Sequence, residues 1–299
     1  MSRRRACTIR PAGDRGSFVL PALHSRPMSE AWSLARDVAQ AAGFDLRACV
    51  TIPDTRQIVR VMTATWGNAQ LLPIEEIRAL AVSGNVPYGA FDGTELVGYV
   101  LGWAGVDADG LHVHSHMLAA MPDRRHAGVG YALKLAQRAQ ALDQGISVVR
   151  WTFDPLVARN AYLNLHKLGA VGDRFERDFY GDMSDEINRG DRTDRLTVRW
   201  DLERAPGPRT AWIHDVPVVL AMAGGPAAPC PEIRAEPTTV AAIAIPSEYH
   251  DLRGGNRALA REWREAVARA IERCLAAGLV ASGFDRDRSS YVFELSGRA

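Results

Sequence analysis

The chain has 299 residues, 47% of them hydrophobic, which is enough for one large domain or two ordinary ones with a substantial core. Its 36 Lys and Arg residues balance 35 Asp and Glu residues, so a net charge of +1 excludes a general attraction to nucleic acid or anionic membranes. The four cysteines have no CxxC spacing, and no stretch reaches the roughly 20 apolar residues of a membrane span. These features predict a cytoplasmic protein with reduced thiols, in which any anion must be bound locally.

The N-terminal part of the sequence predicts a leader followed by alternating helices and strands. Residues 1–26 mix Arg, Gly, Pro and Ser without periodicity, which is typical of a disordered segment. Hydrophobic periodicity then predicts, in chain order, a helix over 29–42, a strand over 46–52, helices over 58–66 and 73–84, and a hairpin over 88–103. The Asp92-Gly93 pair between two β-rich runs is a strong signal for this hairpin.

The remaining sequence predicts further α/β structure and a C-terminal extension. The expected elements are a strand over 111–121, a helix over 129–142, a strand over 147–153, a helix over 157–168, and strands over 171–180 and 196–202. Residues 27–205 therefore predict one mixed α/β domain. Residues 206–237 are rich in Pro, Ala and Gly and indicate a connector, with one strand over 216–222. A strand over 240–245, a helix over 256–277, and strands over 279–284 and 291–295 then follow. We expect 206–299 to pack on the first domain rather than fold alone.

A glycine-containing loop lies between the strand over 111–121 and the helix that begins at Val129. It reads R-x-x-G-x-G from Arg125 to Gly130. Such a turn directs backbone N–H groups outward at the positive end of a helix dipole, and glycine lets an anion approach closely. The loop therefore predicts pyrophosphate binding, although the same glycines could serve tight strand-to-helix packing. It has neither the Gly-Lys-Ser/Thr ending of a Walker loop nor the glycine spacing of a dinucleotide fold.

Residues 111–130, the helix after them and residues 151–170 resemble the GNAT superfamily of acyl-CoA N-acyltransferases. The superfamily's signature is Q/R-x-x-G-x-G/A, which Arg125 to Gly130 matches, and the order of predicted elements over 45–202 matches as well. Residues 151–170 are also similar to a poorly characterised prokaryotic branch that carries a C-terminal extension. The resemblance implies an α/β fold with a mixed, splayed sheet, followed by a C-terminal βαββ extension.

The resemblance implies acetyl-CoA or another acyl-CoA as co-substrate, and no metal. In the superfamily a bulge splays the strand before the loop, so that its backbone binds pantetheine and polarises the thioester. The coenzyme-binding residues implied in this way are Leu118, Ala119, Ala120, Met121, Arg124, Arg125, His126, Ala127, Gly128, Val129, Gly130 and Asn160. Asn160 could equally cap its helix.

Acyl transfer also needs a proton for the departing thiolate. The superfamily often has a tyrosine four residues before the glycine of its penultimate helix, but this chain has Leu165 there. Tyr162, one turn earlier, is therefore a catalytic candidate. His166 and water are alternatives, and Tyr162 could simply be a packing residue.

Three histidines alternate along the strand over 111–121. This spacing directs the imidazoles of His112, His114 and His116 to one face at intervals of about 6 to 7 Å. Three residues in one flat strand diverge rather than converge on an ion, which argues against a metal site. We predict that His114 or His116 is the general base for the acceptor amine, with a purely structural role as the alternative.

A polar loop near residue 190 supplies candidate substrate ligands. Arg192 and Arg195 are predicted to bind a carboxylate, because an arginine fork is its usual partner. That would suit an amino acid acceptor or a succinyl group. Surface Asp–Arg pairs are the alternative. Asp154, before Pro155, could act as a base or cap the next helix.

These features together predict an enzyme, a GNAT-type N-acyltransferase that moves an acetyl or succinyl group from CoA to a primary amine, with amino acids among the candidate acceptors. The alternative is a non-catalytic acyl-CoA sensor, which the missing tyrosine at Leu165 favours. A small-molecule amine is the expected partner, a homodimer is compatible with the sequence, and neither nucleic acid nor a membrane is expected.

Overall fold

The computed structural model describes residues 29–67, 72–124, 128–208, 216–224 and 229–296. The predicted leader over 1–26 lies outside these residues, and so do Arg125, His126 and Ala127 of the predicted phosphate loop. Among the described residues, no helix is both long and apolar enough to cross a membrane.

The N-terminal two-thirds contains most of the predicted elements. Its helices are α1 (Glu30–Ala41), α2 (Ile52–Trp66), α3 (Ile74–Val82), α4 (Val129–Asp143) and α5 (Ala158–Ala161), which continues as a π-helical turn (Tyr162–Lys167). Its strands are β1 (Asp45–Ala48), β2 (Tyr88–Asp92), β3 (Glu95–Asp107), β4 (Gly110–Ala120), β5 (Val148–Phe153), β6 (Val171–Glu176) and β7 (Arg195–Asp201).

The C-terminal segment contains the predicted strand, helix and two strands, and adds to them. Its elements are β8 (Val218–Ala223), β9 (Cys230–Ile233), β10 (Val240–Ala244), α6 (Tyr249–Gly255), α7 (Arg257–Ala276), β11 (Leu279–Asp285) and β12 (Ser290–Leu295). The predicted βαββ order is confirmed, whereas α6 and β9 were not predicted from the sequence.

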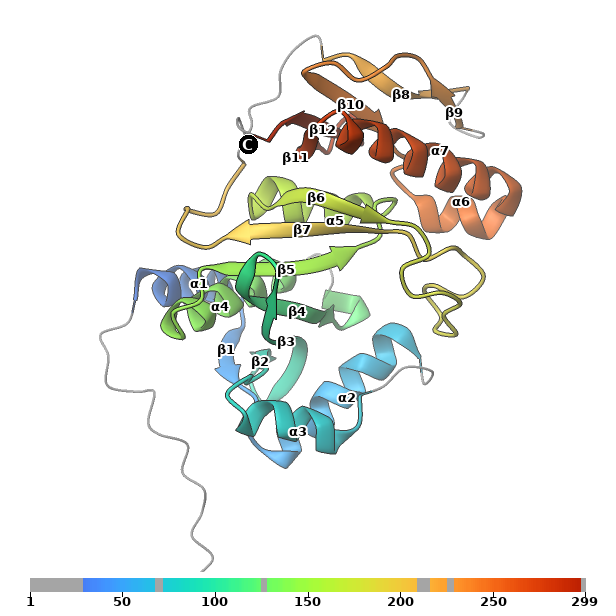
Figure 1. Cartoon of the computed structure of the whole chain (residues 1–299). Coiled ribbons are helices and arrows are strands. Elements are labelled where there is room, and N and C mark those ends of the chain that lie inside the picture. The colour runs from blue at the N-terminus through green and yellow to red at the C-terminus, as the bar shows by residue number, and fades with distance from the viewer. Residues whose placement is uncertain (1–28, 68–71, 125–127, 209–215, 225–228, 297–299) are drawn as a thin grey trace, which may run out of the picture.

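The strands within the described residues form one sheet. Its 12 strands lie in the order β1-β2-β3-β4-β5-β7-β6-β11-β12-β10-β8-β9. The N-terminal strands lie at one end of this sheet and the orange and red C-terminal strands at the other (Figure 1). Parallel pairs, β4 with β5 and β8 with β10, occur among antiparallel ones. The predicted α/β class with a mixed sheet is therefore confirmed.

Local sequence sets the ends of several N-terminal elements. Thr51 caps α2, because its Oγ1 accepts the Asp54 N–H at 3.2 Å while its own N–H donates to Asp54 Oδ2 at 3.0 Å. This reciprocal cap explains why β1 is shorter than the strand predicted over 46–52. The β2–β3 hairpin pairs Asp92 with Glu95, and Gly93 between them adopts φ +57° as a tight two-residue loop requires.

Strands β4 and β5 pair over only a short length. Their parallel register joins Val113 to Val149 and His114 to Arg150, and among the described residues no later pair joins them. The β3–β4 register shifts at the same level, where Leu101 and Gly102 face Met117 and Ser115, so an extra residue, His116, forms a β-bulge. Strands β4 and β5 therefore diverge beyond His114 and Arg150, as the resemblance to the GNAT superfamily implied.

Helices cover both faces of the sheet around β4. On one face α1 and α4 pack on β2 and β3 through a cluster that includes Ala39, Val97 and Leu133. On the other face α2 and α3 pack through a cluster that includes Ile58 and Tyr99. A Cβ on Gly98 would lie 2.6 Å from Val129 Cγ1 and 2.8 Å from the Ala119 carbonyl oxygen, so glycine at 98 lets the start of α4 approach β4.

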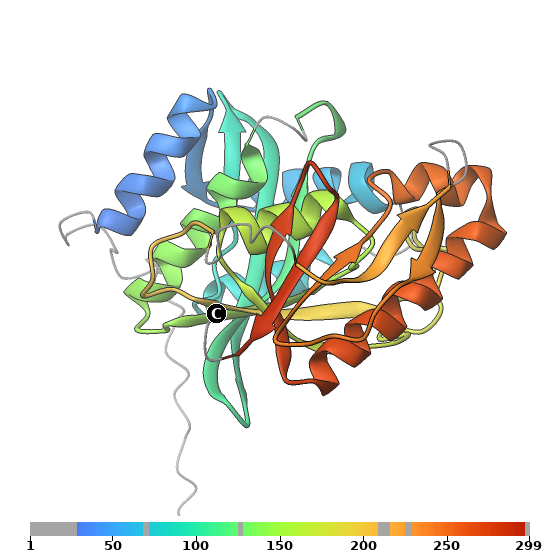
Figure 2. The same ribbon diagram turned by 90° about the horizontal axis from the view of Figure 1, so that it is seen from above.

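The C-terminal strands continue the same sheet. Strand β11 joins β6 through Ala281 opposite Gly172, where a Cβ on the glycine would lie 2.9 Å from Leu196 Cδ2. Helix α7 places Trp263 in a core cluster that also contains Trp151 of β5. From above, α7 runs beside the C-terminal strands (Figure 2). The boundary near residue 205 stays a prediction.

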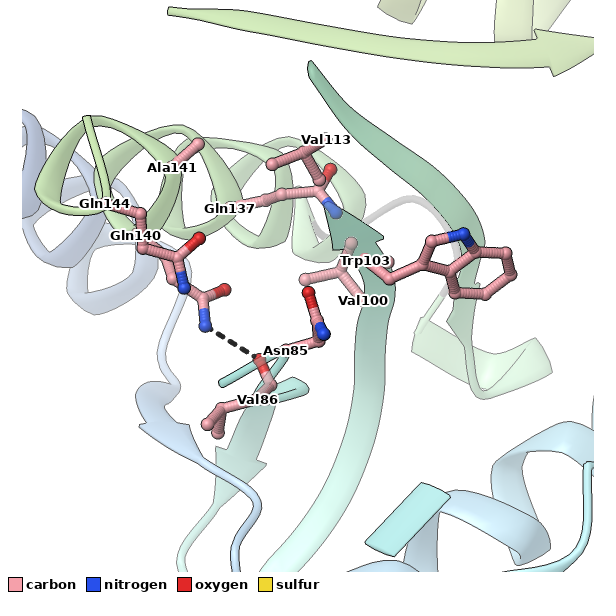
Figure 3. A pocket seen from close by; sticks show the side chains of 10 residues that line it. Asn85, Val86, Val100, Trp103, Val113, Gln137, Gln140, Ala141 and Gln144 are labelled. Carbon is pink, nitrogen blue, oxygen red and sulfur yellow. Dashed lines mark hydrogen bonds between the residues drawn. The ribbon is translucent and has the colours of Figure 1, made fainter. Parts of the chain in front are cut away.

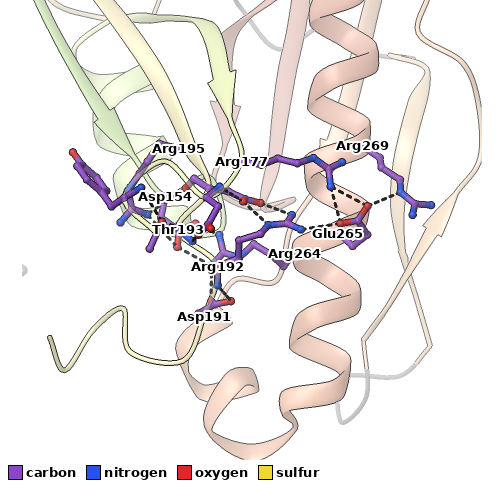
Figure 4. Close-up of polar contacts among 12 residues, drawn as sticks. Asp154, Arg177, Asp191, Arg192, Thr193, Arg195, Arg264, Glu265 and Arg269 are labelled. Atoms are coloured by element: carbon purple, nitrogen blue, oxygen red, sulfur yellow. Dashed lines mark hydrogen bonds and ion pairs between the residues drawn. The ribbon is translucent and has the colours of Figure 1, made fainter. Parts of the chain in front are cut away.

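Arg264 of α7 forms a buried ion-pair network at the end of β5. It donates to Asp154 Oδ1 at 2.7 Å, to Asp154 Oδ2 at 2.9 Å and to Asp191 Oδ2 at 2.6 Å (Figure 4). Tyr249 donates to Asp191 Oδ2 at 2.8 Å. Burial opposes ionisation of Asp154, but the charge and hydrogen bonds of Arg264 outweigh it and hold the pKa of Asp154 below its usual value.

We predict that Arg264→Ala lowers the free energy of unfolding by about 3 kcal/mol, because it removes the nearest cation of two largely buried carboxylates and leaves them only Arg195 at 3.9 Å and Arg253 at 3.6 Å. Denaturant unfolding at neutral pH measures this change. Arg269→Ala is the matched control on the same helix, since Arg269 is 61% exposed and its bond to Glu265 is a surface pair worth about 1 kcal/mol or less. Equal losses in the two variants would contradict the prediction.

Candidate active site

Two of the predicted catalytic histidines lie together beside the point where β4 and β5 separate. The ring centroid of Trp103 is 5.2 Å from that of His114 and 4.8 Å from that of His116, and the two imidazoles are 5.9 Å apart. Trp103 and Met117 pack against the cluster under α2 and α3, whereas Leu118 packs on the α4 side. The bulge at His116 therefore keeps both imidazoles on the α2 face of the sheet.

The surroundings of these histidines favour the neutral imidazole. Burial, followed by the neighbouring His116, His112 and Lys134, lowers the pKa of His114 to about 4. Burial also lowers the pKa of His116. A neutral imidazole can accept a proton, as a general base must. His112 differs, because its Nδ1 lies 3.2 Å from the Gly110 carbonyl oxygen within the β3–β4 hairpin.

Helix α4 begins beside the free length of β4. Gly128 is its N-cap with φ +82°, a left-handed conformation that favours glycine. A Cβ on Gly130 would lie 3.7 Å from both Leu118 Cδ2 and Leu163 Cδ2, which is ordinary contact. The N–H groups of a first helical turn have no acceptor within the helix, so those of Val129 and Gly130 suit an anion. The structure describes residues 128–130 of the predicted loop and also Arg124, which pairs with Asp92 at 2.8 Å.

The end of β4 has one edge paired and one edge directed at the gap. Met121 N–H donates to the Val97 carbonyl at 2.8 Å, so Met121 and, two residues earlier, Ala119 bond toward β3. Because hydrogen bonding alternates sides along an antiparallel strand, Leu118 and Ala120 direct their N–H and C=O groups away from β3. These two residues therefore offer backbone groups to an extended ligand lying between β4 and β5.

The two arginines predicted to bind substrate already contact groups of the chain itself. Arg192 donates to Asp194 at 2.6 and 2.7 Å and to Glu265 at 3.0 Å (Figure 4). Arg195 is buried and donates to Asn188 Oδ1 at 3.0 Å. Neither guanidinium lies beside the two histidines in any contact of the described residues. Their role in carboxylate binding stays a prediction.

The candidates near α5 lie on the opposite face from the histidines. Tyr162 stacks on His166 with ring centroids 4.7 Å apart and planes at 15°. Its neighbour Leu163 contacts the Gly130 position, so this π-helical turn belongs to the α4 side. Leu165 is fully buried in the core, and Asn160 lies in the first turn of α5. The structure thus does not bring Tyr162 next to His114.

Asp154 does not have the surroundings of a free base. Its carboxylate is bound by Arg264 and also accepts the Leu156 N–H at 2.9 Å. Helix α5 begins later, at Ala158. Asp154 thus stabilises the turn after β5. Among the described residues, no group of three or more His, Cys, Asp or Glu side chains is placed to hold a metal ion.

A buried lysine lies under the point where the strands separate. Lys134 of α4 donates to Ser115 Oγ at 2.7 Å and to Gln137 Oε1 at 3.2 Å, and its Nζ is 3.6 Å from the Trp151 ring centroid. Burial lowers its pKa well below the usual value. Lys134 is not among the site residues predicted from the sequence. A lysine between two leucines of a predicted core helix was the available signal.

A small polar pocket lies at the other end of α4 (Figure 3). Its lining residues are Asn85, Val86, Val100, Gly102, Trp103, Val113, Gln137, Gln140, Ala141 and Gln144. Gln140 donates to the Val86 carbonyl at 3.1 Å, and Gln144 donates to the Gly84 carbonyl at 2.9 Å. These hydrogen bonds hold the C-terminal end of α4 against the residues that precede β2. The pocket is therefore a packing feature rather than the candidate site.

Comparisons with known proteins give likenesses of structure. No protein-family model matches the sequence, and no curated protein matches it. YncA from Salmonella typhimurium, solved with its cofactor acetyl-CoA, is 16% identical with a TM-score of 0.44 over 55% of this chain and 98% of that one. The ribosomal-protein-S18-alanine N-acetyltransferase from Escherichia coli is 12% identical, with a TM-score of 0.40 over 56% of this chain and 99% of that one.

A GNAT-family protein from Desulfovibrio desulfuricans is 18% identical, with a TM-score of 0.41 over 53% of this chain and 99% of that one. Each of the three covers little more than half of the chain, so a large part of it has no counterpart in them.

We predict that acid weakens the fold partly through His114. Its pKa is about 4 in the folded chain against a usual 6.5, so between these values the unfolded chain binds a proton that the folded chain does not. The free energy of unfolding should therefore fall as the pH falls from about 6.5 to 4. His114→Gln should reduce this loss, measured by urea unfolding at neutral pH and near pH 5. His112→Gln retains His114 and its burial, which is the largest cause of the shift, so it should keep most of the wild-type dependence. An unchanged dependence in His114→Gln would contradict the assignment.

Proposed function

We propose that this protein is an N-acyltransferase that moves an acyl group from acyl-CoA to a primary amine. The observation that carries the proposal is the separation of β4 and β5 beyond His114 and Arg150, with the N-terminus of α4 beside the free part of β4. An extended thioester ligand needs such a gap, and its pyrophosphate needs such a helix end. The GNAT resemblance of Arg125 to Gly130 supports the same conclusion.

The chain offers groups for each requirement of the reaction. The N–H groups of Val129 and Gly130 would bind the pyrophosphate, and the backbone of Leu118 and Ala120 would bind pantetheine. Acyl-CoA supplies the activated acyl group as a thioester. A neutral imidazole, His114 or His116, would take a proton from the acceptor amine as its nitrogen bonds to the acyl carbon and the carbon–sulfur bond breaks.

The acceptor would approach from the α2 face, where the imidazoles and Trp103 lie. We propose a small-molecule primary amine, with acetyl or succinyl as the acyl group. An amino acid acceptor is the narrower candidate that the arginine-rich loop suggested. Its carboxylate would have to draw Arg192 or Arg195 from the chain's own oxygen atoms, so the present contacts favour an amine without a carboxylate.

We predict that Gly130→Asp weakens binding of acetyl-CoA by about tenfold or more, which corresponds to about 1.4 kcal/mol. A carboxylate in the first turn stabilises a helix but repels a phosphate at the same N–H groups. Gly130→Asn is the matched control, because it has nearly the same size and no charge. Titration calorimetry with acetyl-CoA measures both. Equal affinity of the two variants for acetyl-CoA would show that the pyrophosphate does not bind at the N-terminus of α4.

We further predict that adding a primary amine to the protein and acetyl-CoA releases CoA thiol, which a thiol reagent measures across a panel of amines. Changing both imidazoles, in His114→Gln with His116→Gln, should lower kcat about 10² to 10⁴-fold while acetyl-CoA still binds. The second candidate, a non-catalytic acyl-CoA sensor, is favoured by one observation, the buried Leu165. Tight coenzyme binding without thiol release for any amine would support the sensor instead.

A further inference from the structure

The loop between β6 and β7 brings Tyr180 onto β5 where that strand leaves β4. The Tyr180 hydroxyl lies 3.3 Å from Thr152 Oγ1. Thr152 is two residues beyond Arg150, the last residue of β5 that pairs with β4. Residues paired across two strands have their side chains on the same face of the sheet, so Arg150 lies on the face of His114. Side chains alternate between faces along a strand, so Thr152, two residues after Arg150, lies on that face as well. The Tyr180 hydroxyl therefore lies on the histidine face, at the opposite side of the gap from β4.

Contacts within the loop and with α7 fix the backbone around Tyr180. The Tyr180 N–H donates to Thr193 Oγ1 at 3.0 Å, and the Phe179 N–H donates to the Thr193 carbonyl at 3.0 Å. On the α7 side, Glu265 accepts from Arg177 at 2.8 Å and from Arg192 at 3.0 Å (Figure 4). The C-terminal segment thus holds the loop that carries Tyr180.

A fixed cation lies beside the Tyr180 ring. The Arg195 guanidinium carbon is 5.3 Å from the ring centroid. Arg195 is itself held by Asn188 Oδ1 at 3.0 Å and by the Asp194 carbonyl at 3.2 Å, and it is only 7% exposed. A guanidinium held in this way keeps the Tyr180 ring in place through a cation–π contact. The Tyr180 hydroxyl is therefore held beside Thr152 in a defined position.

Other hydroxyl groups near the gap, among the residues described, are less suited to donating a proton. Tyr99 is fully buried and its hydroxyl contacts Met117 Sδ at 3.6 Å. Ser115 Oγ is buried against Lys134 at 2.7 Å. Tyr162 lies on the α4 side and stacks on His166. The Tyr180 side chain, in contrast, is 44% exposed and can be reprotonated by water.

We propose that Tyr180 donates the proton that the departing coenzyme takes up, and that Arg195 is a positioning residue for it rather than a substrate ligand. As the acceptor nitrogen bonds to the acyl carbon, the carbon–sulfur bond breaks and the sulfur keeps the electron pair. The Tyr180 hydroxyl then transfers its proton to that sulfur, and water returns a proton to the phenolate. This inference rests on the proposed acyl transfer.

We predict that Tyr180→Phe lowers kcat by about 10²-fold or more, because a positioned general acid contributes at least that much, while affinity for acetyl-CoA is unchanged. The ring and its contact with Arg195 remain in this variant. Tyr88→Phe is the matched control and should keep wild-type kcat, because Tyr88 lies on β2 and packs against the Trp32 ring. A normal kcat in Tyr180→Phe, or a loss in Tyr162→Phe alone, would overturn the proposal.

A second measurement tests the position of Tyr180 without relying on turnover. In a Cys230→Ser background, which removes an exposed thiol, Tyr180→Cys is mixed with CoA disulfide. The introduced thiolate attacks the disulfide, forms a mixed disulfide with one CoA and releases the other as thiol. Mass spectrometry should detect this adduct, at a rate at least tenfold above that of Phe179→Cys or Tyr162→Cys.

The outcomes separate the two proposals. If acetyl-CoA binds to the Tyr180→Cys protein but labelling is no faster than in the two control variants, the coenzyme sulfur does not lie beside Tyr180 and this inference is wrong. If calorimetry shows no coenzyme binding to the wild-type protein, the proposed function fails first, and the proton-donor role falls with it.

Discussion

The short parallel pairing between β4 and β5 is the constraint on which the candidate site depends. Two registered pairs hold the strands together at Val113 and His114, and the bulge at His116 turns β4 away just beyond them. Every backbone group in a sheet normally has a partner, so an interruption in mid-sheet leaves donors and acceptors for something else to satisfy. The start of α4, the two imidazoles and Tyr180 all lie around this one interruption.

The interior of this region is unusually polar for a sheet that is covered on both faces. Lys134 lies fully buried under the separation, and His114 above it is held neutral by burial. A neutral imidazole needs less solvation than an imidazolium, which is how His114 can occupy a core. The same neutrality makes His114 a proton acceptor at physiological pH. Burial of His114 therefore both removes its solvation and keeps its imidazole neutral, ready to accept a proton.

The C-terminal segment is more than an appended module in this structure. Its α7 provides Arg264 to the end of β5 and Glu265 to the loop after β6, and Tyr291 of β12 donates to the Pro155 carbonyl at 2.6 Å. All these bonds are made to residues near the gap between β4 and β5. A segment that extends the sheet thus also fixes the β5 turn and the β6–β7 loop. This is a physical reason for the extension to be present.

The sequence by itself determined the element order, the α/β class and the loop at the start of α4, because those features depend on hydrophobic periodicity, on turn chemistry and on glycine within a few residues. It also placed His114 and His116 on one face, which follows from strand geometry alone. Only the tertiary structure decided what lies opposite them. The sequence predicts Arg192 and Arg195 as substrate ligands, yet they donate to Asp194 and Asn188 nearby in the sequence and to Glu265 far from it. The two leucines beside Lys134 are a local signal of its burial, whereas no local pattern places Tyr180 against Thr152. Long-range pairing sets burial and charge partners, and no window of sequence contains both members of such a pair.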